Sequence, residues 1–221
     1  MDILLILVIL IIPAIAQIGI KTNYNKYLKV ANKKGLSGQE VARKILDKNG
    51  LSKVYVVETE GLLSDHYDPR RKTVRLSKAV FEGESISSLS IAAHECGHAI
   101  QDKVGYTFLR IRSLIFPIVN IATSVSYYII LIGFVLQILN LVYIGVGFTL
   151  LGLLFQIITL PVEFNASKRA KEELNKLGLV DKKEAEGVKK MLHSAAMTYV
   201  AGVLASATQI IRLLLIANRR N

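Results

Sequence analysis

The stretch from Leu114 to Leu160 contains no charged residue and is apolar almost throughout. One membrane-spanning helix needs about 20 apolar residues, so this stretch is roughly twice the length of a single span. Charged side chains are costly in hydrocarbon, and their complete absence here favours a lipid environment. We therefore predict a transmembrane hairpin over residues 113–160, with its turn near Gln137–Leu141, where Asn140 interrupts the apolar run.

Two further apolar segments lie towards the ends of the sequence. Ile3–Ile20 is uncharged, and we predict an N-terminal transmembrane anchor over residues 1–20. A cleaved secretory signal is the alternative, because Ala14-Ile15-Ala16 resembles a small-residue cleavage site, but no basic residue precedes the apolar run. Residues 194–221 form the other candidate, which either spans the membrane or packs as a partly buried helix, since Arg212 interrupts it.

The charged residues are concentrated in two blocks between these apolar segments. Lys21–Arg112 holds 17 basic and 10 acidic residues, and Lys168–Lys190 holds 8 basic and 5 acidic residues. Cytoplasmic flanks of membrane spans carry such a basic excess, so we predict that both blocks face the cytoplasm and that the N-terminus and hairpin tip lie outside. Arg219 and Arg220 conflict with this orientation if the last segment spans.

The formal net charge of +11 has the same explanation. Nucleic-acid binding would also suit a basic chain, but the sequence shows no zinc knuckle, RNA-binding sheet motif or helix-turn-helix pattern. We expect the lipid bilayer as a partner and no nucleic acid.

Residues 21–112 carry the local patterns of a small α+β domain. Ser37-Gly38-Gln39-Glu40 fits a capping box that opens a helix, and Asn49-Gly50 would end that helix. Alternation and turn signals predict the remaining elements, which are strands at Val54–Glu58 and Thr73–Ser77 and a helix over about 86–104.

The motif His94-Glu95-Cys96-Gly97-His98 lies inside that last helix. Two histidines four residues apart share one helix face, so both imidazoles can reach a single tetrahedral cation, and nitrogen ligands suit Zn²⁺. Glu95 can stay off the metal and accept a proton from a water that the metal activates. We predict a zinc hydrolase with one Zn²⁺ per chain, His94 and His98 as ligands and Glu95 as general base. Cys96 points away from the histidine face and is predicted to be a packing residue.

A catalytic zinc site needs a third protein ligand, and the candidate is Glu163. This residue follows the hairpin directly and lies on the same side as the histidines if the hairpin crosses the membrane twice. Pro161 is predicted to begin a new helical stretch over residues 161–193. From position alone, a glutamate that the helix dipole favours near a helix start is an equally open interpretation. His66, His193 and Arg169 are candidates for stabilising the oxyanion.

At this point the residues resemble a known group. The octapeptide His94–Gln101, the hairpin and Pro161–Ser167 together resemble the YugP family of bacterial membrane zinc metallopeptidases. Asp65–Pro69, followed by Lys72–Ser77, resembles that family's segment ahead of the zinc helix. In the order of its parts the chain is also similar to HtpX-type and Ste24-type membrane proteases.

The resemblance implies that Glu163 joins His94 and His98 as a zinc ligand and that Glu95 is the base. HtpX-like proteins have an aspartate four residues after the ligand glutamate, where this chain has Ser167, so the resemblance implies no supporting carboxylate at this position. The related proteases also imply that the strand at Thr73–Ser77 is the sheet edge along which an extended peptide pairs.

These predictions combine into a mainly α, integral-membrane fold, in which a small zincin-like α+β catalytic domain joins about four transmembrane helices. The predicted function is that of a gluzincin-like, multi-pass zinc metalloendopeptidase of the cell membrane, acting on polypeptide or membrane-protein substrates at the cytoplasmic face. The hairpin separates the two halves of the site, which would assemble only once the hairpin has folded.

Two other classes of membrane protein fit the sequence less well. A non-catalytic binding or regulatory membrane protein with a structural zinc would need four protein ligands, often cysteines, and the chain has one cysteine. A transporter would need more polar groups within its spans than the four uncharged ones present, which are Asn120, Gln137, Gln156 and Gln209.

Overall fold

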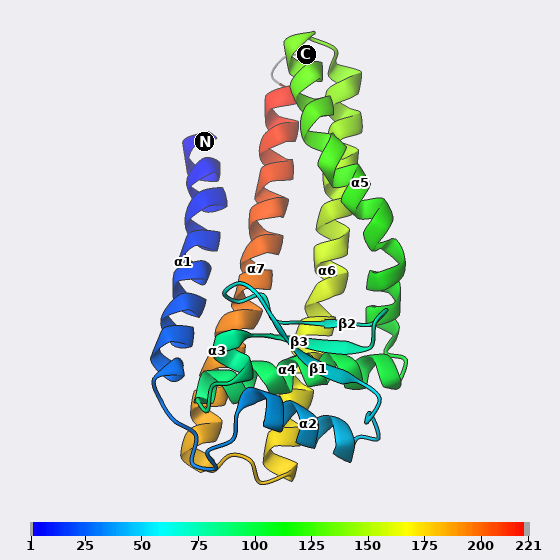
Figure 1. The fold of residues 1–221 in the computed structure, drawn as a ribbon. Coiled ribbons are helices and arrows are strands. Elements are labelled where there is room, and N and C mark those ends of the chain that lie inside the picture. Colours follow the sequence, from blue (N-terminus) through cyan, green and yellow to red (C-terminus); the bar gives the residue numbers. More distant parts are fainter. Residues whose placement is uncertain (1, 219–221) are drawn as a thin grey trace. The chain divides into compact units, whose positions relative to one another are not determined.

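A computed structural model describes residues 2–218, which are mainly helical (Figure 1). Arg219 and Arg220 therefore lie outside the described residues. In chain order the elements are α1 (Asp2–Leu28), α2 (Gly38–Lys48), β1 (Tyr55–Thr59), β2 (His66–Asp68), β3 (Thr73–Ser77), α3 (Lys78–Phe81), α4 (Ile86–Lys103), α5 (Thr107–Val135), α6 (Leu139–Lys176) and α7 (Lys182–Asn218). The predicted fold class, a mainly α protein with long apolar helices and a small α+β part, is confirmed.

The chain divides into two compact units. The first comprises the residues up to Gln17, Arg110–Pro161 and those from Met197 onward. The second comprises Ile18–Leu109 and Val162–Ala196. Helices α1, α5, α6 and α7 each contribute residues to both units, so the unit boundaries fall within continuous helices.

Helices α1, α5, α6 and α7 are each long and apolar enough to cross a membrane. In the first unit, Val142 and Val146 of α6 pack with Ile210 and Leu213 of α7 in one buried cluster. A polar pair also joins these two helices, because the Gln156 amide donates to the Ser206 hydroxyl at 2.9 Å.

The turn between α5 and α6 falls slightly earlier than predicted. It comprises the residues between Val135 and Leu139, where Gln137 adopts a positive φ of 58°. Asn140 lies in the first turn of α6, so the prediction that it marks the turn is wrong. Gln137, with its left-handed backbone conformation, lies where the chain reverses direction. The polar side chain of Asn140 is tolerated because it lies near the start of α6.

The prediction that Pro161 begins a new helix is also wrong. Helix α6 continues from Leu139 to Lys176 with Pro161 in its interior. An interior proline removes one backbone hydrogen bond, and its ring crowds the carbonyl group one turn earlier. The hydrogen bonds of the neighbouring turns can still keep a long helix continuous. The boundary between the two units falls directly after this proline.

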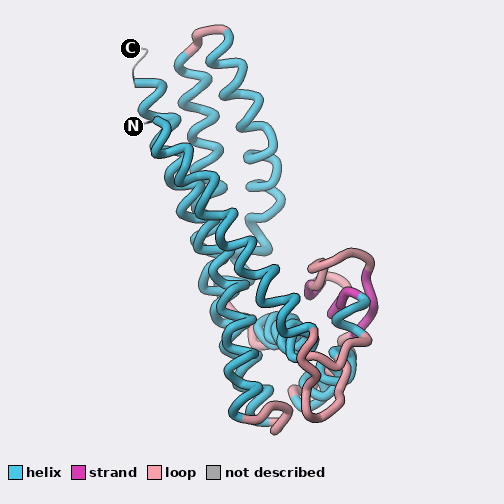
Figure 2. The backbone as a smooth tube through the Cα atoms, turned by 90° about the vertical axis from the view of Figure 1, so that its left-hand side faces the viewer, coloured by secondary structure: helices cyan, strands magenta, loops and turns pink. Residues whose placement is uncertain are grey.

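The three strands form one small mixed sheet in the order β1-β3-β2 (Figure 1). Figure 2 shows the strands in magenta. β1 pairs in parallel with β3, and β2 pairs antiparallel with β3 on the other side. The strand at Thr73–Ser77 is confirmed but lies in the centre of the sheet, so the prediction that it is the edge for a bound peptide is wrong. Strand β2 was not predicted, because its three residues are too few to show an alternating pattern.

Helix α2 begins with the capping box that the sequence predicts. The Ser37 hydroxyl accepts from the Glu40 N–H, and the Glu40 carboxylate accepts from the Ser37 N–H at 2.8 Å. The helix ends at its C-cap Asn49, as expected. Its apolar side packs against α4 in the main core of the second unit, together with the fully buried Val74 and Leu76 of β3.

A candidate metal centre between α4 and α6

Helix α4 holds both histidines in a largely buried position. Its N-cap is Ser85, whose hydroxyl accepts from the Ser88 N–H at 3.0 Å. Nearly every residue from Ile86 to Gln101 is buried, so the core packs around this helix on most sides and fixes its rotation. The rings of His94 and His98 lie edge to face, with their centroids 4.8 Å apart.

Helix α6 approaches α4 at Gly97, the glycine between the two histidines. A Cβ atom at this position would lie only 2.6 Å from the carbonyl O of Ala166. The absence of a side chain at Gly97 therefore lets the backbone of α6 come close enough to place a neighbouring side chain beside the histidines.

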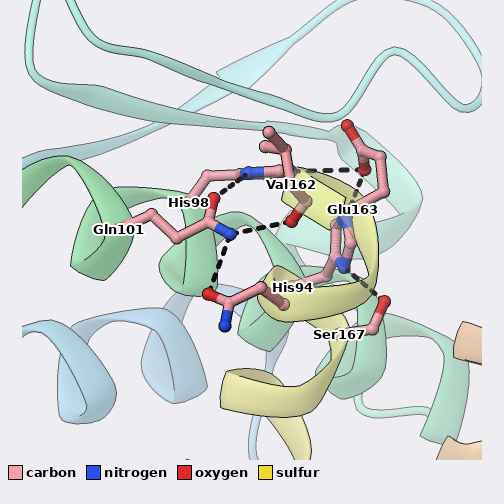
Figure 3. A network of polar contacts seen from close by, with 7 residues as sticks. His94, His98, Gln101, Val162, Glu163 and Ser167 are labelled. Carbon is pink, nitrogen blue, oxygen red and sulfur yellow. Dashed lines mark hydrogen bonds and ion pairs between the residues drawn. The ribbon is translucent and has the colours of Figure 1, made fainter. Parts of the chain in front are cut away.

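That neighbouring side chain is Glu163, which is only 2% exposed. Its Oε2 lies 3.3 Å from Nε2 of His94 and 3.5 Å from Nε2 of His98 (Figure 3). One ligand atom from each of the three residues falls within 4.8 Å of the others, and among the described residues this is the group able to hold a metal ion. Two imidazoles and a carboxylate match the donor set of catalytic zinc sites, which keep a further position for water or substrate.

The other nitrogen of each imidazole has a partner of its own. Nδ1 of His98 lies 3.0 Å from Oε1 of Gln101, and Nδ1 of His94 lies 3.2 Å from Oγ of Ser167. With Nδ1 engaged in this way, Nε2 of each ring faces the carboxylate of Glu163. Partners that orient the second nitrogen are typical of metal-binding histidines.

Glu95 lies beside this group and is only 7% exposed. Burial raises the pKa of Glu95 to about 7, against the opposing influence of His94. The backbone N–H of Tyr67 in β2 also favours the charged form of this carboxylate. A carboxyl group with a pKa near neutrality can both accept and return a proton, as general acid–base chemistry requires.

The neighbouring Cys96 faces the opposite direction. Its thiol contacts the carbonyl O of Ala42 in α2 at 3.6 Å, and burial raises the pKa of the thiol. A neutral, fully buried thiol is a packing group, as its position in the helix predicts.

The three oxyanion candidates lie at different places. His66 is exposed on β2, with its Nδ1 2.8 Å from the carbonyl O of Ser64, and His193 is exposed on α7. Arg169 is half-buried on α6, where its Nε donates to Oδ1 of Asn165 at 2.8 Å. Neither histidine belongs to the metal-holding group found among the described residues.

Sequence reasoning assigned no role to Gln101 or Asn165, although both lie within the quoted motifs. Gln101 is fully buried and three residues after His98 on the same helix. A glutamine three residues after the second histidine was the one available signal, because an amide that is buried on the histidine helix needs partners.

A His-Glu-x-x-His helix with a glutamate from a second helix is the arrangement of zinc metallopeptidases, here in a chain with four candidate membrane-spanning helices. The comparison with protein families agrees. The chain belongs to the family described as "Putative neutral zinc metallopeptidase", whose model matches residues 2–218.

A curated relative is the "Putative membrane protease YugP" of Bacillus subtilis (strain 168). It is 47% identical over 201 residues, which cover 91% of this chain and 89% of that protein. The resemblance to the YugP family inferred from the motifs is thereby confirmed. No solved structure matches the chain.

Proposed function

We propose that this chain is a membrane-embedded zinc metalloendopeptidase, with one Zn²⁺ held by His94, His98 and Glu163. The observation that carries the proposal is the convergence of two Nε2 atoms and one carboxylate within 4.8 Å, beside the buried Glu95. Membership of a zinc metallopeptidase family supports the same metal and the same class of reaction.

Zn²⁺ bound here would polarise the carbonyl of a peptide bond and lower the pKa of a water molecule. Glu95 accepts the proton of the attacking water and returns it to the amine that leaves. Burial suits Glu95 to both steps, because its raised pKa lies close to neutral pH. His94, His98 and Glu163 hold their positions through the packing of α4 against α6.

The alternative of a structural zinc in a non-catalytic protein fits the geometry less well. Structural sites use four protein ligands, whereas the group found among the described residues offers three ligand atoms. Cys96, the one cysteine of the chain, contacts α2 and not this group.

We place the main chain of the polypeptide substrate along β2, the sheet edge on the side of α4. The backbone N–H of Tyr67 favours the charged form of Glu95, so the edge of β2 that is not paired with β3 lies toward the base. The Tyr67 hydroxyl donates to Asp102 of α4 at 2.7 Å and anchors the strand to the helix. An extended peptide paired with β2 would present its bonds to Glu95 in a regular register.

We place the site on the cytoplasmic side of the cell membrane. Four helices can span, and the curated relative is named a membrane protease. The basic excess of both charged blocks supports an orientation with the hairpin tip outside.

Metal dependence tests the proposal. The purified full chain should cleave an unfolded polypeptide such as casein, lose this activity on chelation and regain it with Zn²⁺. His98→Ala should lose bound zinc, whereas His66→Ala, which changes an exposed histidine outside the group, should keep its zinc. Hydrolysis that survives complete removal of the metal would refute the proposal.

A further inference from the structure

The side chain of Gln101 joins the two helices of the metal centre. Its Nε2 donates to the carbonyl O of Val162 at 2.7 Å and to Oδ1 of Asn165 at 3.0 Å, both on α6. Its Oε1 lies 3.0 Å from Nδ1 of His98 on α4 (Figure 3). The residue is fully buried, so these contacts replace the water that its amide would otherwise bind.

The orientation of this amide is fixed by groups whose polarity cannot change. The carbonyl O of Val162 can only accept a hydrogen bond, so the NH₂ group of Gln101 must face it. The Arg169 guanidinium can only donate, so the atom of Asn165 that it contacts is Oδ1, which is also the atom that faces Gln101. Both ends of the network therefore require that Oε1 of Gln101 is the atom facing His98.

The tautomer of His98 follows from this orientation. An amide oxygen can only accept, so Nδ1 of His98 must carry the proton. Nε2 is then left with its lone pair, and this is the nitrogen that faces Glu163. Because a neutral imidazole binds a metal through its unprotonated nitrogen, the network prepares the correct atom of His98 before a metal arrives.

The contact at Nδ1 of His94 imposes no such constraint. Its Nδ1 contacts the Ser167 hydroxyl, which can donate or accept, so that contact does not select a tautomer. The difference singles out Gln101 among the contacts of the two histidines.

We propose that Gln101 is a positioning residue of the metal centre, which fixes the Nδ1–H tautomer of His98 and ties this histidine to the turn of α6 that carries Glu163. The role rests on the proposed zinc site but not on the nature of the reaction.

The tautomer can be read directly by NMR. The chain has four histidines, so selective ¹⁵N-histidine labelling of the full-length, zinc-free protein gives few imidazole signals. His66→Gln and His193→Gln assign the two exposed rings. The proposal predicts that Nδ1 of His98 carries a proton and that Nε2 is the unprotonated nitrogen whenever this ring is neutral. An Nε2–H tautomer in the wild-type protein would overturn it.

Two substitutions test the cause of the tautomer. Gln101→Leu should release His98 into a mixture of tautomers. Gln101→Glu should restore the Nδ1–H tautomer, because a carboxylate also accepts from Nδ1, although it cannot donate to α6. The same tautomer in Gln101→Leu as in the wild type, or a tautomer mixture in Gln101→Glu, would each contradict the proposal.

Zinc affinity, measured by competition with a chromophoric chelator, separates positioning from folding. Loss of such a contact typically weakens metal binding by about 10–100-fold, and we expect this for Gln101→Leu. The matched control is Asn32→Leu, which removes a buried amide that bonds Leu36 and Glu84 away from the site. It should lower thermal stability with little change in zinc affinity. Equal losses of affinity in both variants would show a merely structural role for Gln101.

These results are separable from the proposed function. The NMR experiment uses neither zinc nor substrate, so it reports on Gln101 even if the protein cleaves no peptide. A protein that binds zinc through His98 but never hydrolyses a polypeptide would refute the protease and leave the role of Gln101 intact.

Discussion

At the residue scale, both histidines of the centre contact neutral groups through Nδ1. His98 faces an amide oxygen and His94 faces a hydroxyl. A carboxylate in either place would make the imidazole a stronger ligand, as in carboxylate–histidine–zinc arrangements. Ser167 stands at the sequence position where HtpX-like proteins have an aspartate, and its hydroxyl contacts Nδ1 of His94.

Ser167→Ala should weaken zinc binding modestly. It removes one neutral hydrogen bond, worth about 1 kcal/mol and hence roughly a fivefold loss of affinity. Ser167→Asp should have the opposite effect, because a carboxylate strengthens the histidine it contacts. Chelator competition on both variants measures the difference, and tighter binding by the alanine variant would speak against this contact.

Cys96→Ala should leave the zinc content unchanged. The thiol is fully buried and contacts α2, so its loss creates a small cavity and lowers the free energy of unfolding by about 1 kcal/mol. Metal analysis combined with thermal denaturation tests this expectation. A variant that folds normally but loses its zinc would reveal a sulfur ligand.

The proximity of the two histidines and of the proposed base Glu95 could be predicted from the sequence, because their spacing is local to one helix. Glu163 depended on the family resemblance, since no local pattern shows which glutamate returns to the histidines. The roles of Gln101 and Ser167 could not be predicted, because they depend on the rotation and register of α6 against α4, which only the packed structure defines.

At the element scale, the close approach of α4 and α6 depends on Gly97. A methyl group there would lie 2.6 Å from a backbone oxygen of α6, which cannot move aside as a flexible side chain could. The role of this glycine in the structure is to allow the close approach of the two helices.

Gly97→Ala should therefore destabilise the protein by about 1–3 kcal/mol, the usual cost of overpacking, and weaken zinc binding by separating Glu163 from the histidines. Gly19→Ala is the matched control, because a Cβ there meets nothing within 4 Å. In a helix that change should be neutral or slightly stabilising. Thermal denaturation and chelator competition measure both effects, and a Gly97→Ala protein as stable as Gly19→Ala would contradict the packing argument.

The sheet shows what local patterns leave undetermined. The residue patterns of β1 and β3 predicted two strands, but an alternating pattern does not show which strand pairs with which. β3 is central because β2, only three residues long, covers its second edge. The proposed strand for pairing with a substrate peptide is therefore His66–Asp68 and not Thr73–Ser77.

At the scale of the whole molecule, the long uncharged stretch corresponds to two long apolar helices joined by a short turn, and their crossing of a membrane stays a prediction. Its length required two spans, and α5 and α6 are both candidates. The continuity of α6 through Pro161 was not predictable, because a proline is compatible with both a helix start and a helix interior.

The proposed orientation predicts which sites a membrane-impermeant maleimide can label in intact cells. Gln137→Cys, at the exposed hairpin turn, should react from outside. Lys182→Cys, exposed at the start of α7, should react only after the membrane is permeabilised. The native cysteine is fully buried and should give little background. The reverse labelling pattern would invert the orientation.

The most direct test of the proposed zinc peptidase activity is the Glu95→Gln variant, with zinc content and hydrolysis of an unfolded polypeptide measured on the same samples. Loss of the general base typically costs about 10²–10⁴-fold in rate. We predict a loss of at least that order with wild-type zinc content, because Glu95 stands beside the metal ligands without being one of them. Wild-type hydrolysis by this variant, or loss of zinc together with activity, would contradict the account.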